Sequence, residues 1–219
     1  MVSKVVASAE EAVADIADGS TILVGGFGNA GMPAQLMDAL IAQGARDLTV
    51  VCNNAGNGDT GLAALLKTKR VTKIICSFPR QADSYVFDAL FRAGEIELEV
   101  VPQGNLVERL RAAGAGIGAF YTPTSHGTIL AEGKESRTID GRDYVLEYPI
   151  RADIAIIKAF KGDRWGNLVY RKTARNFGPV MAMAAQTTIA QVDEIVELGA
   201  LDPEAIITPG IFVYRVVAA

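Results

Sequence analysis

Residues 18–33 read DGSTILVGGFGNAGMP, and this stretch decides the fold. Its apolar run, Thr21–Val24, is bounded by glycines, which is typical of a buried strand. The four glycines that follow allow the backbone to bend sharply and to approach a ligand closely. Pro33 suits the first turn of a helix, whose free N–H groups favour an anion. The stretch therefore predicts a strand, a loop and a helix, with a phosphate or carboxylate bound at the loop.

The same pattern recurs along the chain. Apolar runs that predict further buried strands lie at residues 48–51, 73–76, 96–101, 154–158 and 189–192. Between several of these runs, residues 33–43 and 105–113 carry apolar side chains at helical spacing. Alternating strands and helices predict an α/β fold with an open, mostly parallel sheet and helices on both faces. Ligands bind such sheets at the carboxyl ends of the strands.

Residues 127–148 differ from this pattern. Glu132-Gly133 and Asp140-Gly141 are turn signals between short β-prone segments, which predicts a small antiparallel insertion. No internal repeat, low-complexity tract or linker composition divides the sequence. A chain of 219 residues, half of them hydrophobic, can bury one sizeable core. We therefore expect a single domain over residues 1–219.

Composition restricts the partners and the location. The net charge of −4 provides no general attraction to nucleic acid or to anionic lipid, so neither is expected as a partner. No apolar run approaches membrane-spanning length, and the N-terminus does not resemble a signal peptide. Cys52 and Cys76 lie in apolar runs without metal-ligand spacing, which indicates buried free thiols and no metal site. These features predict a cytoplasmic protein.

Gly26, Gly28 and Gly31 also match G-x-G-x-x-G, the pattern of nicotinamide-dinucleotide sites. Such a site normally has an acidic residue about 20 residues further on, at the end of the second strand, which binds the ribose. Here the second strand is followed by Asn53 and Asn54. The amides remove the usual ribose acceptor and disfavour a dehydrogenase. A tight glycine turn without a ligand is a further alternative.

Residues 18–33 resemble the signature of the A subunit of family I coenzyme A (CoA) transferases. Other blocks resemble that subunit in matching order, at residues 53–56, 102–106, 111–117, 120–124, 131–135, 166–168, 171–177 and 208–211. The resemblance spans nearly the whole chain. It implies the fold of that family, an open α/β sheet shared with the ribose-phosphate isomerase-like superfamily.

Moving CoA between two carboxylic acids requires a nucleophile that can form an anhydride and then a thioester, and a carboxylate meets this demand. The resemblance implies that the glutamate with this role belongs to a B subunit, within a Ser-Glu-Asn/Gly-Gly type motif that this chain lacks. Glu132, followed by Gly133, is interpreted as a turn residue. We therefore expect an inactive chain that works with a B subunit in an A2B2 hetero-oligomer. CoA enters as a thioester substrate, and no tightly bound cofactor is expected. A catalytically silent CoA-binding subunit is the alternative.

Three amide side chains are the main candidates for the site. By resemblance, Gln103 corresponds to a glutamine near the thioester carbonyl, where it would support the oxyanion of each tetrahedral step. Alternatively, Gln103 caps the helix that starts near Gly104. Asn53 and Asn54 could orient a carboxylate or a pantetheine amide, or they could only form an Asx-type turn.

The glycine loop is expected to line the CoA or acyl pocket. Its residues are Val24, Gly25, Gly26, Phe27, Gly28, Asn29, Ala30 and Gly31. Phe27 would supply an apolar wall there or pack in the core. The basic residues Arg171, Lys172 and Arg175 are interpreted as a solvated face or a subunit contact. His126 suggests no catalytic triad, because no serine or cysteine nucleophile arrangement accompanies it.

The identity of the acid depends on fewer residues. Residues 27–33 and 76–83 differ from the acetoacetate-type pattern and resemble the branch of the family found in aromatic degradation, the β-ketoadipate pathway. This resemblance implies transfer of CoA from succinyl-CoA to 3-oxoadipate, with acetoacetate or another 3-oxo acid as the alternative. Because 3-oxoadipate carries a second carboxylate, Arg80 could bind it bidentately. Arg80 could also serve the succinyl donor or form only a surface ion pair.

Overall fold

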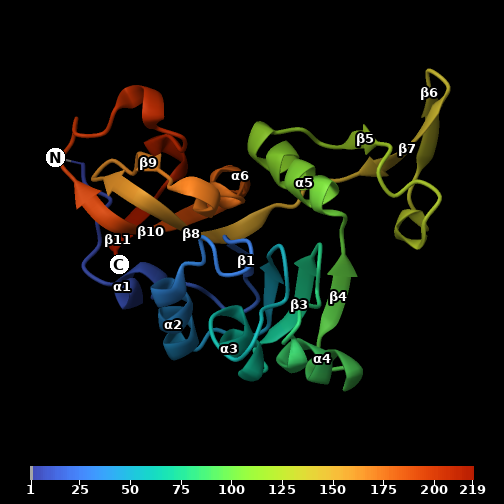
Figure 1. Ribbon diagram of the computed structural model, residues 1–219, viewed down its shortest axis with the longest axis horizontal. Helices are drawn as coiled ribbons and strands as arrows, with labels where there is room; N and C mark the ends of the chain where they lie inside the picture. The colour runs from blue at the N-terminus through green and yellow to red at the C-terminus, as the bar shows by residue number, and fades with distance from the viewer. Residues whose placement is uncertain (1) are drawn as a thin grey trace.

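The computed structural model describes residues 2–219, and its main feature is an eight-stranded sheet (Figure 1). Seven strands follow the order β11-β10-β8-β1-β2-β3-β4, and every neighbouring pair in this order is parallel. The short strand β9 pairs antiparallel with β8. The strands are β1 Thr21–Val24, β2 Leu48–Val51, β3 Val71–Cys76, β4 Glu97–Val100, β8 Ala152–Asp163, β9 Leu168–Val169, β10 Ala185–Val196 and β11 Arg215–Ala218. The predicted open, mostly parallel sheet is confirmed.

Helices cover both faces of this sheet, as predicted. The helices α1 Ala9–Val13, α2 Ala34–Gln43, α3 Leu62–Lys67 and α4 Tyr85–Arg92 lie below it in Figure 1, whereas α5 Gln103–Ala115 and α6 Gly178–Ala184 lie above. Because side chains alternate along a strand, β1 contributes to two cores. Ile22 and Val24 pack with α1 to α4, and Leu23 packs with α5 and α6.

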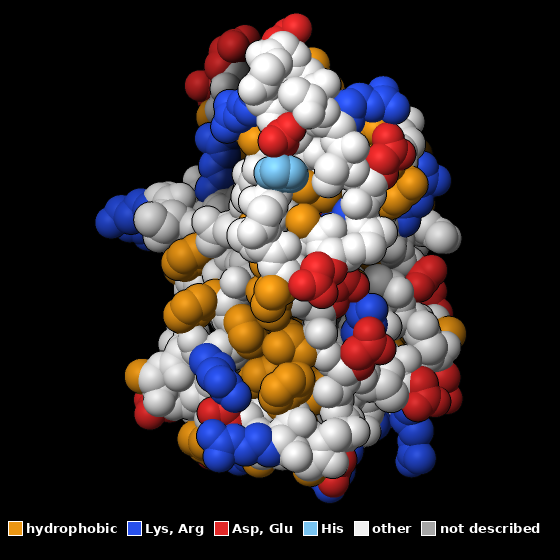
Figure 2. Space-filling model, turned by 90° about the vertical axis from the view of Figure 1, so that its right-hand side faces the viewer, with side chains coloured by type: hydrophobic (Ala, Val, Ile, Leu, Met, Phe, Trp, Pro, Cys, Tyr) orange, Lys and Arg blue, Asp and Glu red, His pale blue; other side chains and the backbone are white. Residues whose placement is uncertain are grey.

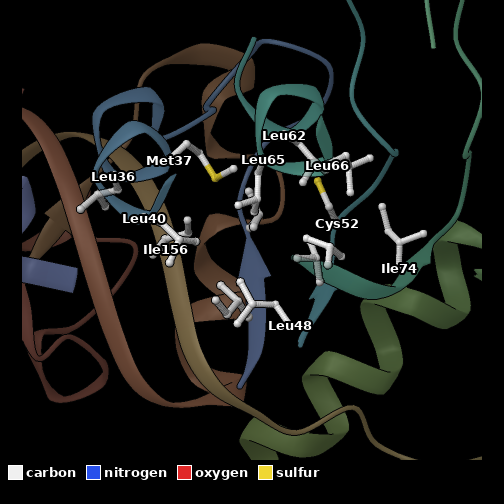
Figure 3. Packing of buried hydrophobic residues seen from close by; sticks show 14 of the residues in the cluster. Leu36, Met37, Leu40, Leu48, Cys52, Leu62, Leu65, Leu66, Ile74 and Ile156 are labelled. Atoms are coloured by element: carbon white, nitrogen blue, oxygen red, sulfur yellow. The ribbon is translucent and has the colours of Figure 1, made fainter. Parts of the chain in front are cut away.

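The first core lies between the sheet and helices α2 and α3. Figure 3 shows the apolar side chains that meet there: Leu36, Met37, Leu40, Leu48, Cys52, Leu62, Leu65, Leu66, Ile74 and Ile156. All ten are essentially inaccessible to solvent. Burial of each large side chain contributes about 1.5–3 kcal/mol to stability. This packing therefore fixes the strand ends from which the loops of the site begin.

Glycines end the two helices that the sequence predicted. α2 ends at Gly44, which has φ of 101° and donates its N–H to the Leu40 carbonyl. α5 ends at Gly116, which has φ of 73°. These left-handed C-terminal glycines satisfy carbonyls that the helix leaves free. α2 matches its prediction within one residue, while α5 extends two residues beyond its prediction at each end.

A separate three-stranded antiparallel sheet confirms the predicted insertion. It has the order β5-β7-β6, with β5 Phe120–Thr122, β6 Ser136–Ile139 and β7 Arg142–Glu147. Asp140 and Gly141 form the turn between β6 and β7, with φ of 49° and 76°. Positive φ at both positions is the requirement of a type I′ hairpin turn. The sheet projects from one side of the fold and begins earlier than predicted, at Phe120 (Figure 1).

Figure 2 shows the face of the molecule on that side, where charged side chains of both signs are interspersed around an apolar patch. Short 3-10 turns complete the fold: η1 Ile129–Ala131, η2 Lys172–Arg175, η3 Pro203–Ala205 and η4 Gly210–Phe212. Within residues 2–219, no helix has the length and apolar character needed to cross a bilayer. The same residues contain no cluster of three or more His, Cys, Asp or Glu side chains that could hold a metal ion.

Candidate functional site

The site begins where the chain reverses its direction across the sheet. The chain runs from β1 outward to β4 and returns to β8, which pairs with the other side of β1. A crevice at the carboxyl ends of the strands is expected at such a reversal. The glycine loop follows β1 there, and Asn53 and Asn54 follow β2. The structure therefore brings together the two segments from which the site was predicted.

The glycine loop is a tight turn that two backbone hydrogen bonds close. Phe27 and Ala30 exchange backbone hydrogen bonds of 3.0 and 3.2 Å, which places Gly28 and Asn29 at the tip. At Gly31, φ is 76° and an added Cβ would lie 2.6 Å from the Ala174 carbonyl oxygen. Glycine is therefore required at this position, where the loop packs against η2.

The start of α2 does not offer an anion site, which corrects the sequence prediction. The helix begins at Ala34, one residue after Pro33. The backbone N–H groups of Gln35 and Leu36 donate to Oε1 of Gln191, at 3.1 and 3.4 Å. Gln191 is buried on β10. Because a neutral side chain already satisfies these two donors, they are not free to bind the predicted phosphate or carboxylate. An anion at the glycine loop itself stays a prediction.

Asn53 and Gln103 form the central pair of the site. Nε2 of Gln103 donates to Oδ1 of Asn53 at 2.8 Å, and the hydroxyl of Ser77 lies 2.7 Å from the same oxygen. Asn53 is 3% exposed, so its orientation is fixed by these contacts. Its own Nδ2 makes no hydrogen bond to any described residue, and Gln103 keeps a second amide hydrogen free. Three N–H donors are thus available on two adjacent, neutral amides.

The capping explanation for Gln103 is wrong. Helix α5 begins at Gln103 itself, and it has no hydrogen bond from a capping side chain. The Gln103 amide instead bridges to the end of a different strand, 50 positions away in the sequence. Its side chain therefore lies at the crevice and does not cap the helix.

Asn54 combines both interpretations that the sequence left open. Its Oδ1 accepts the N–H of Gly56 at 2.9 Å, which forms the expected Asx-type turn. Its Nδ2 is buried and has no hydrogen-bond partner among the described residues. Buried amide groups are nearly always paired, so an unpaired donor at this edge favours a bound acceptor, such as a carbonyl or carboxylate oxygen.

Two cavities lie at the glycine loop. The first, of about 410 Å³, is lined by Phe27, Gln103, Val107, Arg111, Arg175, Asn176, Phe177, Pro179, Val180 and Met183. The second, of about 590 Å³, is lined by Gly28, Asn29, Met32, Ala34, Asp38, Asn54, Gly56, Asn57, Asp59, Thr60, Gly61, Leu62, Ala64, Gln81 and Lys158. Consecutive loop residues thus border different cavities, and the loop separates a largely apolar space from a polar one.

Comparison with known proteins now identifies the family. A family model described as Coenzyme A transferase matches residues 6–219. The chain belongs to the coenzyme A transferase family. The resemblance stated from the sequence motifs is therefore confirmed.

Several relatives of this CoA transferase chain carry more specific names. It is 72% identical to the A subunit of 3-oxoadipate CoA-transferase from Pseudomonas putida, over 100% of this chain and 94% of that protein. It is 68% identical to the protein of the same name from Acinetobacter baylyi, over 99% and 95%. It is 53% identical to the A subunit of succinyl-CoA:3-ketoacid coenzyme A transferase from Xanthomonas campestris, over 96% and 87%.

Solved structures confirm the fold expected for this family. An acyl-CoA transferase from Escherichia coli O157:H7, crystallised as a thioester complex with CoA, superimposes with a TM-score of 0.88 at 25% identity. The match covers 100% of this chain and 47% of that chain. Glutaconate CoA-transferase of Acidaminococcus fermentans has the same fold, with a TM-score of 0.87 at 24% identity over 99% of this chain and 76% of that chain.

The other predicted loop residues of the CoA transferase chain have different environments. Phe27 is 52% exposed and lines the first cavity, so the core alternative is wrong for it. Val24, by contrast, is a core side chain with no exposure, and Gly25 and Gly26 are buried beneath the loop. Ala30 accepts a hydrogen bond from Nδ2 of Asn176 at 2.9 Å. Of the loop, only Phe27, Gly28 and Asn29 border these two cavities.

Arg80 is not brought to the site. Its Nε lies 2.6 Å from Oδ1 of Asp88 on an exposed part of the molecule, and it lines neither cavity. The surface-pair alternative therefore describes its present contact. Its role toward a substrate carboxylate stays a prediction.

Arg175 borders the site, which its sequence pattern does not predict. Together with Arg171 and Lys172 it is expected on a solvated face or at a subunit contact, whereas the structure places it at the first cavity with Phe27 and Gln103. Arg171 lies over the Phe160 ring at 5.4 Å and borders neither cavity. The only sequence signal for Arg175 was its position in the block 171–177, because nothing in the local pattern distinguishes the three cations.

The remaining candidates behave as interpreted. Glu132 is exposed and follows η1, next to Gly133 with φ of 75°. Nε2 of His126 lies 4.0 Å from Asp143 on the projecting sheet. Cys52 and Cys76 are free and buried. Burial raises the pKa of the Cys76 thiol to about 12 and also raises that of Cys52, so neither thiol is an active nucleophile at neutral pH.

Proposed function

We propose that this chain is the A subunit of a CoA transferase that moves CoA from succinyl-CoA to 3-oxoadipate. One observation carries the proposal: Gln103, which is hydrogen-bonded to the buried Asn53, lines a cavity at the carboxyl ends of the strands and keeps an amide donor free. The substrate assignment is supported by two relatives, 72% and 68% identical, that are each named as the A subunit of 3-oxoadipate CoA-transferase.

The chemistry assigns different roles to this chain and its partner. A carboxylate that the B subunit supplies attacks the thioester of succinyl-CoA, and the CoA thiolate leaves as a mixed anhydride forms. The thiolate then attacks the partner's carbonyl, which releases succinate and leaves a CoA thioester on the partner. The same two steps in reverse, with 3-oxoadipate as the acid, form 3-oxoadipyl-CoA and regenerate the carboxylate. Each attack places negative charge on a carbonyl oxygen.

This chain stabilises that charge. Gln103 and Asn53 each present N–H donors that are fixed before the reaction, because they are hydrogen-bonded to each other and to Ser77. Fixed donors cost little reorganisation when the oxyanion forms. Phe27 bounds the acyl side of the crevice, and Gly28 and Asn29 bring the backbone of the loop close to the CoA chain.

We assign the second cavity to the pantetheine part of CoA. The unpaired Nδ2 of Asn54 would donate to one of its amide carbonyls, and the volume of about 590 Å³ is within the range of small-molecule sites. CoA is a substrate in this scheme, and no tightly bound cofactor takes part. Arg80 is retained as a proposed contact for an acyl carboxylate, to be tested beside Arg175 below.

The proposal includes the assembly and the location. This chain requires a B subunit that supplies the carboxylate, and we propose an A2B2 hetero-oligomer. The two free buried thiols suit the reducing cytoplasm. Acetoacetate is the second candidate acceptor, since a 53% identical relative is named as the A subunit of succinyl-CoA:3-ketoacid coenzyme A transferase.

The test is to purify the chain with and without its B subunit, then to follow transfer from succinyl-CoA to 3-oxoadipate, acetoacetate and a longer 3-oxo acid. We expect transfer only in the complex, with the highest kcat/KM for 3-oxoadipate. A CoA thioester trapped on the B subunit, located by mass spectrometry, would support the division of labour. Full activity of the isolated chain, or a complex that prefers acetoacetate, would contradict the proposal.

A further inference from the structure

We infer that Arg175 binds the distal carboxylate of the acyl group, and that it makes the enzyme selective for dicarboxylic substrates. This inference rests on the proposed function, because it concerns the acyl end of the same reaction. It goes further by assigning the recognition of the second carboxylate, present in both succinyl-CoA and 3-oxoadipate, to one side chain of this subunit.

Two cations border the first cavity, and they differ in whether their charge is paired. Arg111 also borders it, but its Nε lies 3.0 Å from Oε2 of Glu108. Arg175 is exposed and forms no hydrogen bond or ion pair with any residue between 2 and 219. A guanidinium has five N–H donors in a planar fork that suits a carboxylate. Arg175 is therefore the cation at this cavity whose charge is not already compensated.

Arg175 lines the same cavity as Gln103, the proposed oxyanion donor. The lining also includes the apolar side chains of Phe27, Val107 and Val180. A dicarboxylic acyl chain presents groups that match these three kinds of side chain: a reacting carbonyl, methylenes and a distal anion.

The backbone at Arg175 is connected to the glycine loop. It is the last residue of η2, and the following Asn176 donates through Nδ2 to the carbonyls of Ala30 and Thr173, at 2.9 and 2.8 Å. Gly31 lets this turn approach the glycine loop closely. The backbone that carries Arg175 is thus tied directly to the loop that forms the crevice.

Arg80 is the competing candidate from the sequence. Its guanidinium is already paired with Asp88 at 2.6 Å and lies outside both cavities. To bind a substrate carboxylate it would have to leave that partner, whereas Arg175 would not. The geometry therefore favours Arg175 for this role.

The experiment uses the complex of this chain with its B subunit, together with pairs of substrates that differ only in the distal group. Succinyl-CoA is compared with butyryl-CoA as donor, and 3-oxoadipate with 3-oxohexanoate as acceptor. For Arg175→Gln we expect kcat/KM to fall about 10- to 100-fold for the dicarboxylic member of each pair, as for loss of one charge-assisted contact. The monocarboxylic member should change less than about threefold, so the selectivity collapses.

Three variants complete the design. Arg175→Lys keeps the charge but loses the fork, and should recover part of the selectivity. Arg171→Gln, four residues earlier and outside the cavities, should leave both members of each pair unchanged. Arg80→Gln tests the competitor: if it abolishes the selectivity and Arg175→Gln does not, the inference is wrong. Melting temperatures of all complexes show whether each variant is folded.

The outcomes separate this inference from the proposed function. Equal losses for both members of a pair would mean that Arg175 binds a CoA phosphate or supports the fold, and would overturn the carboxylate role. An unchanged Arg175→Gln enzyme would overturn it as well. If the wild-type complex transfers CoA but prefers acetoacetate to 3-oxoadipate, the proposed acceptor fails, while the succinyl and butyryl pair still tests Arg175.

Discussion

Replacing Gln103 by alanine removes one of the two amides proposed to bind the oxyanion. In the structure, one Nε2 hydrogen of Gln103 is used on Asn53, at 2.8 Å, and one hydrogen remains for the substrate. Loss of a single donor to an oxyanion typically lowers kcat by about 10²- to 10³-fold, or about 2.7–4 kcal/mol of transition-state stabilisation. We expect a loss in this range, with KM changed much less.

The same substitution should cost little stability. Gln103 is exposed, and its one hydrogen bond within residues 2–219 contributes about 0.5–1.5 kcal/mol at most. Asn53, in contrast, is 3% exposed, so Asn53→Ala should lower both the activity and the free energy of unfolding. A large effect on rate with a small effect on stability is therefore the signature expected of Gln103 alone.

The assay is initial-rate formation of 3-oxoadipyl-CoA by the complex, followed by chromatography, together with urea unfolding of each variant. Asn53→Ala and the double variant complete a thermodynamic cycle. Because the two amides are in direct contact, their effects on the barrier should be non-additive by about 0.5–3 kcal/mol. If Gln103→Ala turns over within about threefold of the wild type, the oxyanion role is refuted, since loss of one such donor typically costs about 10²-fold or more in kcat.

Three further predictions concern stability and reactivity. Gly31→Ala should lower the free energy of unfolding by about 3 kcal/mol or more, because φ of 76° and a backbone oxygen 2.6 Å from the new Cβ both oppose it. Gly28→Ala, with φ of 59° and open space, should cost only about 1 kcal/mol; equal costs in urea unfolding would contradict the packing argument. The thiols of Cys52 and Cys76 should resist iodoacetamide at pH 8 until the chain is unfolded. Rapid labelling of the folded chain would contradict this. Burial raises the pKa of Cys76 from 9.0 to about 12, so as the pH rises the unfolded chain loses this proton before the folded chain does. The free energy of unfolding should therefore fall as the pH rises from 9.0 to about 12. Glu147→Ala should lower the free energy of unfolding by about 3 kcal/mol and expose β5 to β7 to proteolysis. The substitution removes a buried carboxylate that accepts hydrogen bonds from Lys134 at 2.7 Å and from Asn105 at 3.1 Å. Cleavage at the wild-type rate would show that this carboxylate does not anchor the sheet.

Most of the fold could be predicted because its signals are local. The strands β1 and β2 match their predicted bounds, since each apolar run is bounded by turn residues on both sides. The strands β8 and β10 are each twelve residues long, far beyond the predicted segments. Their outer halves include charged residues such as Lys161 and Glu194, whose ion pair at 2.6 Å is formed only once the two strands are adjacent. Tertiary pairing thus overrides local composition there.

Residues of the site could be predicted only where they directly follow a predicted strand. Asn53, Asn54 and Gln103 each follow a strand, so topology alone places them at one edge of the sheet. Arg80 also follows a strand, but it points to Asp88, and no sequence pattern reveals that choice. The use of the α2 donors by Gln191 could not be predicted either, because it joins positions more than 150 residues apart.

The glycine loop therefore has a different role from the one its sequence first indicates. Its turn is closed by the reciprocal bonds of Phe27 and Ala30, and the first N–H groups of the helix after it donate to Gln191, so these particular backbone groups are not free to hold an anion. The glycines keep the loop free of bulky side chains. Gly31 lets η2 pack closely against the loop, and nothing lies within 4 Å of the position that a Cβ would take at Gly28. The donors proposed for the oxyanion are instead the side-chain amides of Asn53 and Gln103. These amides do not titrate, so neither can be the carboxylate nucleophile in the proposed reaction.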